Sequence, residues 1–463
     1  MRRFSVRVSA SCFVVALLLT TAGDALAQAG VAQGSQPKVE ATNANAAHAS
    51  PSNLAGDAGA LYEDASKYVE RKFEEFRRAR VPYNSALATK TYQEQRELAA
   101  RHAAALAARG KLTGTDHYYL GLLYDLAGKT PEAIEPLRRF LDASSPEGTK
   151  EQRQNARLML GAEVAALKRF DEAEQLLTDY ARSDPATPQG LFKLHHALAR
   201  AYSSNKKLEQ SAAHARAAFR VAKESPVKAG DELSRAQVIA SAGEFLADAL
   251  VGLKKEREAA ETMEELLRLG LTLPSAQVFA LAERWLAEND QEKLIERVLG
   301  ETPTPDAAPL ATAPEIDIAE WIDQKPLKLA DLRGRVVVLD FWATWCAPCR
   351  FTMPKLKTLD ERFKREGLVV IGLTQFFGRA GKNVVTPTEE LAYLRSYKKD
   401  LKLPYAFAVA NDAANNMRYG VYSIPTAFII DRRGRVRYIY VGASDADEDA
   451  LAAVIEKLLA EQP

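Results

Sequence analysis

Residues 336–350 read VVVLDFWATWCAPCR, an apolar run that ends in two closely spaced cysteines. The β-branched and aromatic residues of Val336–Trp342 are typical of a buried strand. A helix then opens at the cysteine pair, Cys346 and Cys349, and runs on toward Phe363. Because unpaired N–H groups and the helix dipole stabilise a thiolate at a helix N-terminus, this arrangement predicts a reactive pair. Two cysteines at this spacing can close a disulfide, and the more exposed thiol attacks.

Further motifs accompany this stretch in the last third of the chain, from near Pro314 onward. They are LADLRGRVVVLDFWATWCAPCR at 329–350, Pro354 in the helix after the cysteines, and YGVYSIPTAFIIDRRGRV at 419–436. A CxxC alone is weak evidence for a family. The combination of a strand, WCxPC, a proline in the following helix and a later IPT before another strand is much more specific. The region therefore resembles the thioredoxins, and more closely the TlpA/ResA-like disulfide oxidoreductases of the bacterial envelope.

The resemblance implies roles for the cysteines and for one acid. Cys346 would attack the client disulfide, and Cys349, one turn into the helix, would resolve the mixed disulfide. Asp340 matches the buried aspartate that moves protons for the second cysteine in thioredoxins, and an acid inside such an apolar strand is costly unless it has a task. Many envelope relatives instead place a glutamate shortly after the second cysteine, where this chain has Thr352.

The resemblance also implies a client-binding surface. Pro425 matches the cis-proline that faces the disulfide in this family. The backbone of Ile424 would then lie beside Cys346 and could pair with an extended client segment in the manner of an added strand. Trp345 and Pro348 would shape the contact surface. We expect no cofactor beyond the redox-active disulfide itself.

Other interpretations of these residues remain open from the sequence. The cysteine pair could be an inert structural bridge, and Asp340 could be an exposed aspartate at a strand end. A structural zinc site needs four ligands, but only one CxxC is present and the C-terminal region contains no histidine. The adjacent His195 and His196 invite a metal hypothesis, but neighbouring helix residues point in divergent directions. We therefore expect no metal site.

The first 27 residues have the pattern of a signal peptide. A basic start, a short apolar core and a small-residue cleavage signature are found at Arg2–Arg7, Cys12–Leu19 and Ala25–Ala27. The apolar core is shorter than the roughly 20 residues that span a membrane, although an uncleaved anchor is the rival interpretation. Cleavage before Gln28 would leave two cysteines, so the mature protein is not a disulfide-stapled fold. We expect a periplasmic or otherwise extracytoplasmic protein.

The remaining chain divides by composition into four parts, and at 463 residues about three folded domains are expected. The predicted parts are a disordered linker at 28–56, a helical region at 57–300, a Pro/Thr/Ala linker at 301–315 and a thioredoxin-like domain at 316–463. A formal charge of +1 gives no electrostatic reason to expect nucleic acid as a partner. The predicted fold class is therefore an all-α helical region followed by an α/β domain.

The helical region contains an internal repeat. The same spacing of a glycine and an alanine recurs at Gly121–Ala133 and at Gly161–Ala173, and more degenerate helix pairs follow. This resembles the tetratricopeptide repeat, in which small residues let paired helices pack closely. A generic helical array without a peptide groove is the alternative. On the first interpretation, the repeats dock a protein partner.

Alternating strands and helices predict an α/β sheet covered on both faces in the last domain. The expected strands are 336–342, 368–374, about 405–409, 427–430 and 436–441, and the expected helices follow Cys346 or cover 389–400, 413–419 and 447–460. Residues 376–388 are long for a connection and contain three Gly or Pro residues, so we expect a surface loop near the site. The sequence does not indicate what this loop does.

The sequence favours a thiol–disulfide reductase over two other functions. Ala347-Pro348 between the cysteines is closer to the Gly-Pro of reducing thioredoxins than to the pairs of oxidising relatives, which often contain a histidine. The family resemblance implies that the clients are disulfide-containing proteins, with heme-protein cysteines in cytochrome c maturation as one class, and that a membrane thiol-transfer protein supplies the electrons. One alternative is a scaffold in which the thioredoxin domain only docks. The other is a thiol peroxidase, but Leu339 and Ala343 replace the proline and hydroxyl residue of that motif.

Overall fold

A computed structural model of the chain describes residues 57–79, 81, 84–142, 147–226, 231–290, 310, 312–443 and 446–461. The predicted signal peptide at 1–27 and the predicted linker at 28–56 lie outside the described residues. Most of the predicted linker at 301–315 does so too. Within the described ranges, none of the helices has both the length and the apolar character that crossing a membrane requires.

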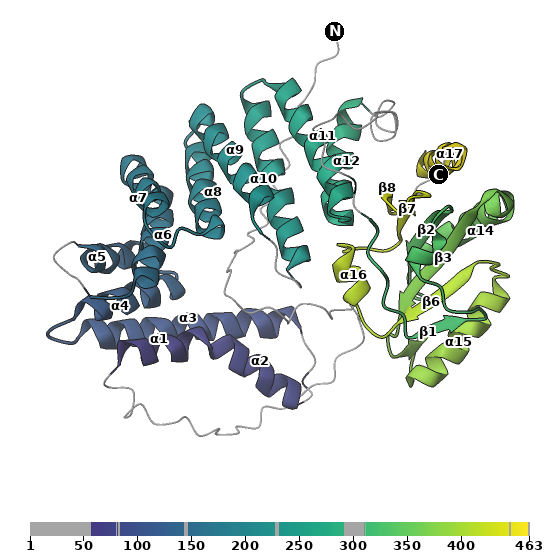
Figure 1. Cartoon of the computed structure of the whole chain (residues 1–463). Helices are drawn as coiled ribbons and strands as arrows, with labels where there is room; N and C mark the ends of the chain where they lie inside the picture. Colours follow the sequence, from purple (N-terminus) through teal and green to yellow (C-terminus); the bar gives the residue numbers. More distant parts are fainter. Residues whose placement is uncertain are drawn as a thin grey trace, which may run out of the picture. The chain divides into compact units, whose positions relative to one another are not determined.

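Helices occupy the described residues from Ala58 to Asp290 (Figure 1). Their bounds are α1 Ala58–Ser66, α2 Tyr68–Arg78, α3 Ser85–Ala107, α4 Gly114–Leu126, α5 Thr130–Leu141, α6 Lys150–Ala166, α7 Phe170–Arg182, α8 Pro188–Ser204, α9 Leu208–Glu224, α10 Glu232–Gly252, α11 Glu256–Thr272 and α12 Ala276–Asp290. Successive helices pack as hairpins, α4 on α5, α6 on α7, α8 on α9 and α10 on α11. The predicted all-α character of this region is confirmed.

The four hairpins share a backbone feature at their turns. One residue in each turn has a left-handed conformation, and these residues are Gly128, Lys168, Lys206 and Lys254, with φ of 72°, 63°, 60° and 58°. A non-glycine residue in this conformation is uncommon. The left-handed residue recurs at the same place in all four hairpins and is a lysine in three of them, which shows a structural repeat that extends beyond the two copies with clear sequence similarity.

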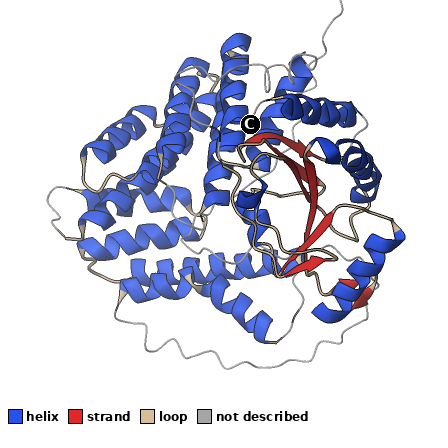
Figure 2. Cartoon of the chain, turned by 45° about the vertical axis from the view of Figure 1, so that its right-hand side comes forward, coloured by secondary structure: helices blue, strands red, loops and turns tan. Residues whose placement is uncertain are grey.

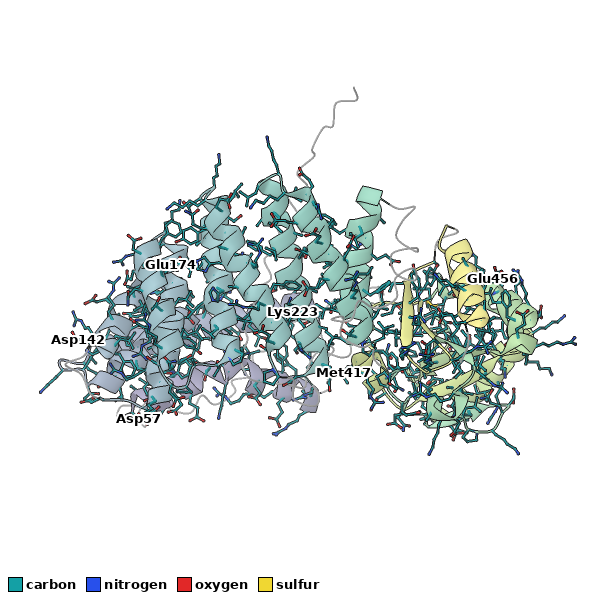
Figure 3. The ribbon with its side chains drawn as sticks, turned by 45° about the horizontal axis from the view of Figure 1, so that its top comes forward. Asp57, Asp142, Glu174, Lys223, Met417 and Glu456 are labelled. Atoms are coloured by element: carbon teal, nitrogen blue, oxygen red, sulfur yellow. A yellow bond between two sulfur atoms is a disulfide. The ribbon has the colours of Figure 1, made fainter. Side chains whose placement is uncertain are left out.

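Small residues let these helices approach one another, as the repeat predicts. A Cβ atom at Gly121 would lie 2.6 Å from Cγ of Leu137, and one at Gly161 would lie 2.6 Å from Cδ2 of Leu194. Figure 3 shows side chains filling the space between the helices. Real Cβ atoms essentially never have contacts this short, so a larger residue at either glycine would force its neighbour to move.

The C-terminal domain is built on one twisted sheet (Figure 2). Its strands are β1 Glu320–Ile322, β2 Val336–Phe341, β3 Leu368–Gln375, β6 Ala406–Ala410, β7 Thr426–Ile430 and β8 Val436–Val441, in the spatial order β1-β6-β3-β2-β7-β8. Strand β2 pairs parallel with β3 and antiparallel with β7. The predicted α/β class is confirmed, whereas β1 and the short hairpin β4 Arg379–Ala380 and β5 Asn383–Val384 were not predicted.

Helices cover both faces of this sheet. They are α14 Cys349–Phe363, α15 Pro387–Asp400, α16 Ala414–Arg418 and α17 Ala446–Ala460, with short 3₁₀ turns at Leu329–Leu332 and Lys364–Glu366. Trp342 stacks on Tyr397 of α15 on one face, while Phe341 packs against Tyr419, just after α16, on the other. One boundary prediction is wrong: α14 begins at Cys349, so Cys346 lies in the turn before the helix.

The segment directly before β1 is part of the domain and not of a linker. Thr312 forms a β-bridge with Arg435, and the N–H of Ala313 donates to the carbonyl of Gly434 at 2.8 Å. The carboxylate of Glu315 accepts hydrogen bonds from the backbone N–H groups of Leu329 and Ala330 at 3.0 and 2.6 Å. The domain therefore begins by Thr312, earlier than the predicted boundary at 316, because backbone pairing was not visible in this Pro/Ala-rich composition.

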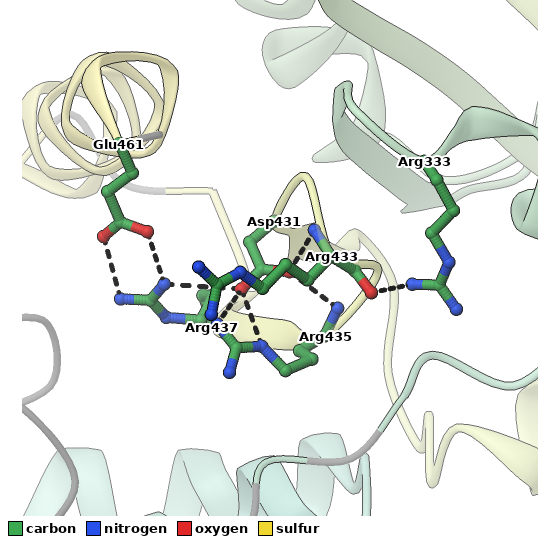
Figure 4. Close-up of polar contacts among 6 residues, drawn as sticks. All are labelled: Arg333, Asp431, Arg433, Arg435, Arg437 and Glu461. Atoms are coloured by element: carbon green, nitrogen blue, oxygen red, sulfur yellow. Dashed lines mark hydrogen bonds and ion pairs between the residues drawn. The ribbon is translucent and has the colours of Figure 1, made fainter. Parts of the chain in front are cut away.

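The turn between β7 and β8 is held by a buried carboxylate (Figure 4). Asp431 accepts hydrogen bonds from the backbone N–H groups of Arg433 and Arg435 at 2.9 Å each, and from the Arg435 guanidinium at 2.8 and 3.0 Å. Arg437 contacts Asp431 at 3.4 Å and forms a two-pronged pair with Glu461 at 2.7 and 3.0 Å. Both oxygens of Asp431 are thus paired, which is how a buried charge is normally tolerated.

Helices α9–α12 and the sheet share one continuous apolar core, whereas most buried residues of the earlier helices form two separate clusters. The backbone N–H groups of Ala276 and Gln277, at the start of α12, donate to the carbonyls of Tyr419 and Gly420 at 3.2 Å each. Tyr438 of β8 donates its hydroxyl to Glu283 of α12 at 2.6 Å. The last helix of the repeat region therefore hydrogen-bonds to the residues just before the loop that carries Pro425.

Gly270 of α11 provides a test of the close helix packing. A Cβ there would lie 2.7 Å from the backbone N and 2.8 Å from Cα of Phe279 in α12, and backbone atoms cannot step aside. Gly270→Ala should therefore lower the free energy of unfolding by about 1–3 kcal/mol, although alanine is the better helix former. Gly110→Ala is the control, because its Cβ meets nothing within 4 Å. Urea unfolding followed by far-UV circular dichroism compares them, and equal midpoints would contradict the close packing.

Candidate active site

Cys346 and Cys349 form a disulfide, with their sulfur atoms 2.03 Å apart. Cys346 lies in the turn after β2, and Cys349 is the first residue of α14. The N–H of Cys349 donates to the sulfur of Cys346 at 3.1 Å, so the helix N-terminus is directed at that sulfur. Cys346 is 4% exposed and Cys349 is fully buried. Both features favour Cys346 as the attacking thiol, because a thiolate there would gain the hydrogen bond and the helix dipole.

The loop before β7 lies against the disulfide. The Ile424–Pro425 peptide bond is cis, as the family resemblance implied. The carbonyl oxygen of Ile424 is 3.6 Å from the sulfur of Cys346, a distance at which a reduced thiol can donate to it. Thr426 closes the loop by donating its hydroxyl to the carbonyl of Ser423 at 2.8 Å. The predicted residues Cys346, Ile424 and Pro425 are therefore brought together.

Asp340 is buried inside the sheet, so the exposed-aspartate alternative is wrong. It is 2% exposed and lies in β2 between Gly372 of β3 and Ala427 of β7. Its Oδ2 atom has no hydrogen-bond partner among the described residues. Burial in this apolar setting penalises the charged form and raises the pKa of Asp340 to about 7. The carboxyl group can therefore gain or lose a proton near neutral pH.

Two further buried polar groups of this domain were not identified from the sequence. Tyr405, just before β6, is buried with its hydroxyl unpaired among the described residues, and burial followed by the charge of Asp340 raises its pKa. Asp360 of α14 is also buried; its Oδ2 lies 3.8 Å from the Lys364 amine but has no hydrogen-bond partner among the described residues, and burial raises its pKa despite Lys364. The burial of Asp360 could have been predicted from one feature of the sequence. Asp360 shares the apolar side of the helix with Leu356, Leu359 and Phe363.

Thr352 occupies the position where many envelope relatives carry a glutamate. Its side chain is buried, and its hydroxyl donates to the carbonyl of Cys349 at 3.0 Å. Thr352 therefore satisfies a backbone group in the first turn of α14 and supplies no acid. This leaves Asp340 as the acid that the sequence associates with the cysteines.

An exposed aromatic pair includes the residue next to Cys346. Trp345, which directly precedes Cys346, is 49% exposed, and Phe377 from the loop after β3 is 37% exposed. Their ring centroids are 5.4 Å apart in an edge-to-face arrangement. Pro348 is exposed as well, as predicted for a contact surface. Sequence reasoning identified the loop at 376–388 as near the site but did not single out Phe377.

Comparison with known proteins agrees with this geometry. The Redoxin family matches residues 306–455. Thiol-disulfide oxidoreductase ResA of Oceanobacillus iheyensis is 30% identical over 179 residues, covering 38% of this chain and 80% of that protein. ResA of Bacillus thuringiensis subsp. konkukian is 34% identical over 116 residues, covering 25% of this chain and 60% of that protein, which is under two thirds of its length. The chain belongs to the ResA-like thiol-disulfide oxidoreductases.

A solved structure described as a thiol-disulfide isomerase from Corynebacterium glutamicum is 25% identical, covers 32% of this chain and 98% of its own, and has a TM-score of 0.28. The similarity to the ResA proteins confirms the predicted family of the C-terminal domain. The Redoxin match begins after the helices α1–α12.

Among the described residues, no group of three or more His, Cys, Asp or Glu side chains is placed to hold a metal ion.

The buried acid of this ResA-like site should make stability depend on pH. The folded pKa of Asp340, about 7, exceeds the unfolded value near 3.9. The folded chain therefore holds this proton more tightly, and Asp340 lowers stability progressively as pH rises from about 4 to about 7. Asp340→Asn should accordingly raise the free energy of unfolding by roughly 3–4 kcal/mol at pH 8 and by little at pH 4.

Urea unfolding followed by tryptophan fluorescence measures this effect, because Trp321, Trp342 and Trp345 lie in the sheet domain. Asp431→Asn is the matched control, since that aspartate is equally buried but ion-paired, and its loss should destabilise the domain at pH 8. If Asp340→Asn raised the free energy of unfolding by the same amount at pH 4 and at pH 8, the raised pKa would be contradicted.

Proposed function

We propose that this protein is an exported thiol–disulfide reductase whose working group is the Cys346–Cys349 pair. The observation that carries the proposal is the placement of the disulfide. Its outer sulfur, that of Cys346, accepts the N–H at the start of α14 and faces the carbonyl of Ile424. An inert bridge needs neither a thiolate-stabilising helix end nor a facing backbone group.

The reaction proceeds through one mixed disulfide. The Cys346 thiolate attacks one sulfur of the client disulfide, forms a new S–S bond and releases the other client sulfur as a thiolate, which takes up a proton. The Cys349 thiol then loses its proton and attacks the sulfur of Cys346, which releases the second client thiolate. Two electrons thus pass from the enzyme dithiol to the client, and the enzyme disulfide is left. A dithiol electron donor must reduce that disulfide before the next cycle.

Asp340 supplies the proton transfer that resolution requires. A carboxyl group with a pKa of about 7 can accept a proton from the Cys349 thiol and return it in the reverse step. An ordinary aspartate with a pKa near 3.9 would be a much weaker base. The unpaired Oδ2 atom leaves an acceptor site for that proton. Burial thus gives Asp340 a proton affinity suited to this role.

The direction of electron flow follows from the residues between the cysteines. Ala347 and Pro348 provide no cation that would stabilise the thiolate further and make the disulfide strongly oxidising. The proposed clients are therefore oxidised proteins, with heme-protein cysteines in cytochrome c maturation as one class. The proposed donor is a membrane thiol-transfer protein.

The helical region serves in this proposal to bind a protein partner. Four hairpins with the same turn conformation form an array of the kind that offers an extended surface. Tyr202 and His214 both contact the Glu174 carboxylate at 2.8 Å, which joins three successive helices of this array (Figure 3 labels Glu174). These hydrogen bonds hold the helices in fixed relative positions, as a docking surface requires.

Trapping experiments test the roles of the three residues. Cys349→Ser should accumulate mixed disulfides through Cys346, because the resolving thiol is gone, whereas Cys346→Ser should trap few. Asp340→Asn should form the mixed disulfide at the wild-type rate and resolve it more slowly, by at least tenfold if general-base catalysis is lost. Quenched-flow mixing with an oxidised protein client, followed by non-reducing electrophoresis, resolves the two steps. Equal trapping by the two cysteine variants would show that the roles are assigned wrongly.

Export is tested on the protein purified from its host. The basic start, apolar core and Ala25-Leu26-Ala27 predict cleavage before Gln28. Mass spectrometry of the intact protein should therefore give the mass of residues 28–463. Replacing Ala25 and Ala27 with bulky residues should block processing and leave the precursor mass. Soluble protein that retains Met1 would refute the proposed cleavage.

A further inference from the structure

The loop after β3 is held at both ends by backbone hydrogen bonds. The N–H of Phe376 donates to the carbonyl of Ala410 in β6 at 3.0 Å. The N–H of Val385 donates to the carbonyl of Gly378 at 3.0 Å and closes the β4–β5 hairpin. Phe377 lies between these two anchors. Its backbone position is therefore set by the sheet on one side and by the hairpin on the other.

A buried carboxylate fixes the backbone at Phe377 directly. Glu390, in the first turn of α15, is 3% exposed. Its Oε1 accepts the N–H of Phe377 at 3.0 Å, and its Oε2 accepts the N–H of Gly378 at 2.8 Å. Hydrogen bonds to an ionised group are about twice as strong as neutral ones, and these two offset the cost of burying the charge. The carboxylate thus clamps the two residues where the chain enters the hairpin.

The clamp keeps an exposed aromatic ring beside the disulfide. Phe377 meets Trp345 edge to face at 5.4 Å, and both rings remain more than one-third exposed. Val384, on the β5 strand of the same hairpin, is 94% exposed. Fixed apolar side chains that face water in this way mark interaction sites more often than isolated surface residues do. Because Trp345 directly precedes Cys346, whatever covers this pair lies next to the attacking sulfur.

We propose that Phe377 is a specificity-determining residue and Glu390 the positioning residue that holds it. The client-binding surface then extends from the disulfide and Ile424 onto the hairpin. It selects polypeptide disulfides in which an aliphatic or aromatic side chain lies beside the attacked cysteine, because that side chain is buried against the exposed surfaces of Phe377 and Trp345. This inference rests on the proposed reductase function and names the client chemistry that the site prefers.

Single-turnover reduction of two matched peptides tests the proposal. Each peptide carries one intramolecular disulfide, with leucine beside the attacked cysteine in one peptide and serine in the other. The full-length protein is reduced and freed of reductant, and the rate of peptide reduction is measured at several peptide concentrations. Wild type should prefer the leucine peptide on the order of tenfold in kcat/KM. Phe377→Ala should bring the ratio of the two rates close to one, and Phe377→Leu should restore much of it.

Glu390→Gln tests the clamp, with Glu389→Gln as the control from the neighbouring position. Glutamine places an N–H₂ group where one carboxylate oxygen accepts a backbone N–H, so Glu390→Gln should lower the preference and speed amide exchange at Phe377 and Gly378. Glu389 is exposed and caps Thr386, and glutamine keeps that capping box, so Glu389→Gln should change neither readout.

The outcomes separate this inference from the proposed function. Wild type that reduces both peptides equally, or Phe377→Ala that keeps the wild-type ratio, overturns the inference and leaves the reductase function standing. Wild type that reduces neither peptide nor bis(2-hydroxyethyl) disulfide overturns the reductase function and this inference with it. A preference that persists in Glu390→Gln despite faster amide exchange overturns the positioning role of Glu390.

Discussion

Strand β2 is buried on both faces and yet must end at a reactive group, and this constraint organises the domain. All six of its residues are buried between the parallel strand β3 and the antiparallel strand β7. In that register Phe341 pairs with Thr426, so the chain leaving β2 toward Cys346 passes the residues that lead into β7, Ile424 and Pro425. The contact between the disulfide and the cis-proline loop is therefore a consequence of sheet register. A shift of one residue would turn the side chains of β2 to opposite faces and separate these groups.

The start of α14 decides which sulfur can become a stable thiolate. Pro348 has no N–H group and caps the helix, so the first donor of the helix is the N–H of Cys349, and it points at the sulfur of Cys346. Cys349 itself lies within the helix and is fully buried. The same short turn thus exposes one sulfur to the field of the helix and shields the other. This asymmetry is what a pair with distinct attacking and resolving thiols requires.

The sequence predicted elements whose information is local and missed those that depend on tertiary contacts. The apolar β-branched run of β2, the WCxPC turn and the IPT before β7 each carry their own pattern, so the central strands and the cysteine pair were predicted. Strand β1 is only three residues long, and Thr312–Glu315 looked like a linker, because both are defined by partners far along the chain. Nothing in the local sequence distinguishes Glu390 from other acids near the start of a helix. Its burial, and with it the position of Phe377, arises only when the loop after β3 folds back onto α15.

Asp431, Glu390 and Asp340 are three of the buried carboxyl groups in this domain, and their surroundings differ. Asp431 pairs with arginines and Glu390 accepts two backbone N–H groups, so both oxygens of each have partners and each residue holds the chain in place. Asp340 is as deeply buried, but one of its oxygens has no partner among the described residues, and its pKa is raised to about 7. An asparagine could occupy a neutral buried site of this shape without the cost of desolvating a charge. The fold therefore tolerates a destabilising acid at the centre of its sheet, whereas it satisfies the carboxylates of Asp431 and Glu390. That difference is expected of a group whose proton must move, and it sets Asp340 apart from the carboxylates that only hold the chain in place.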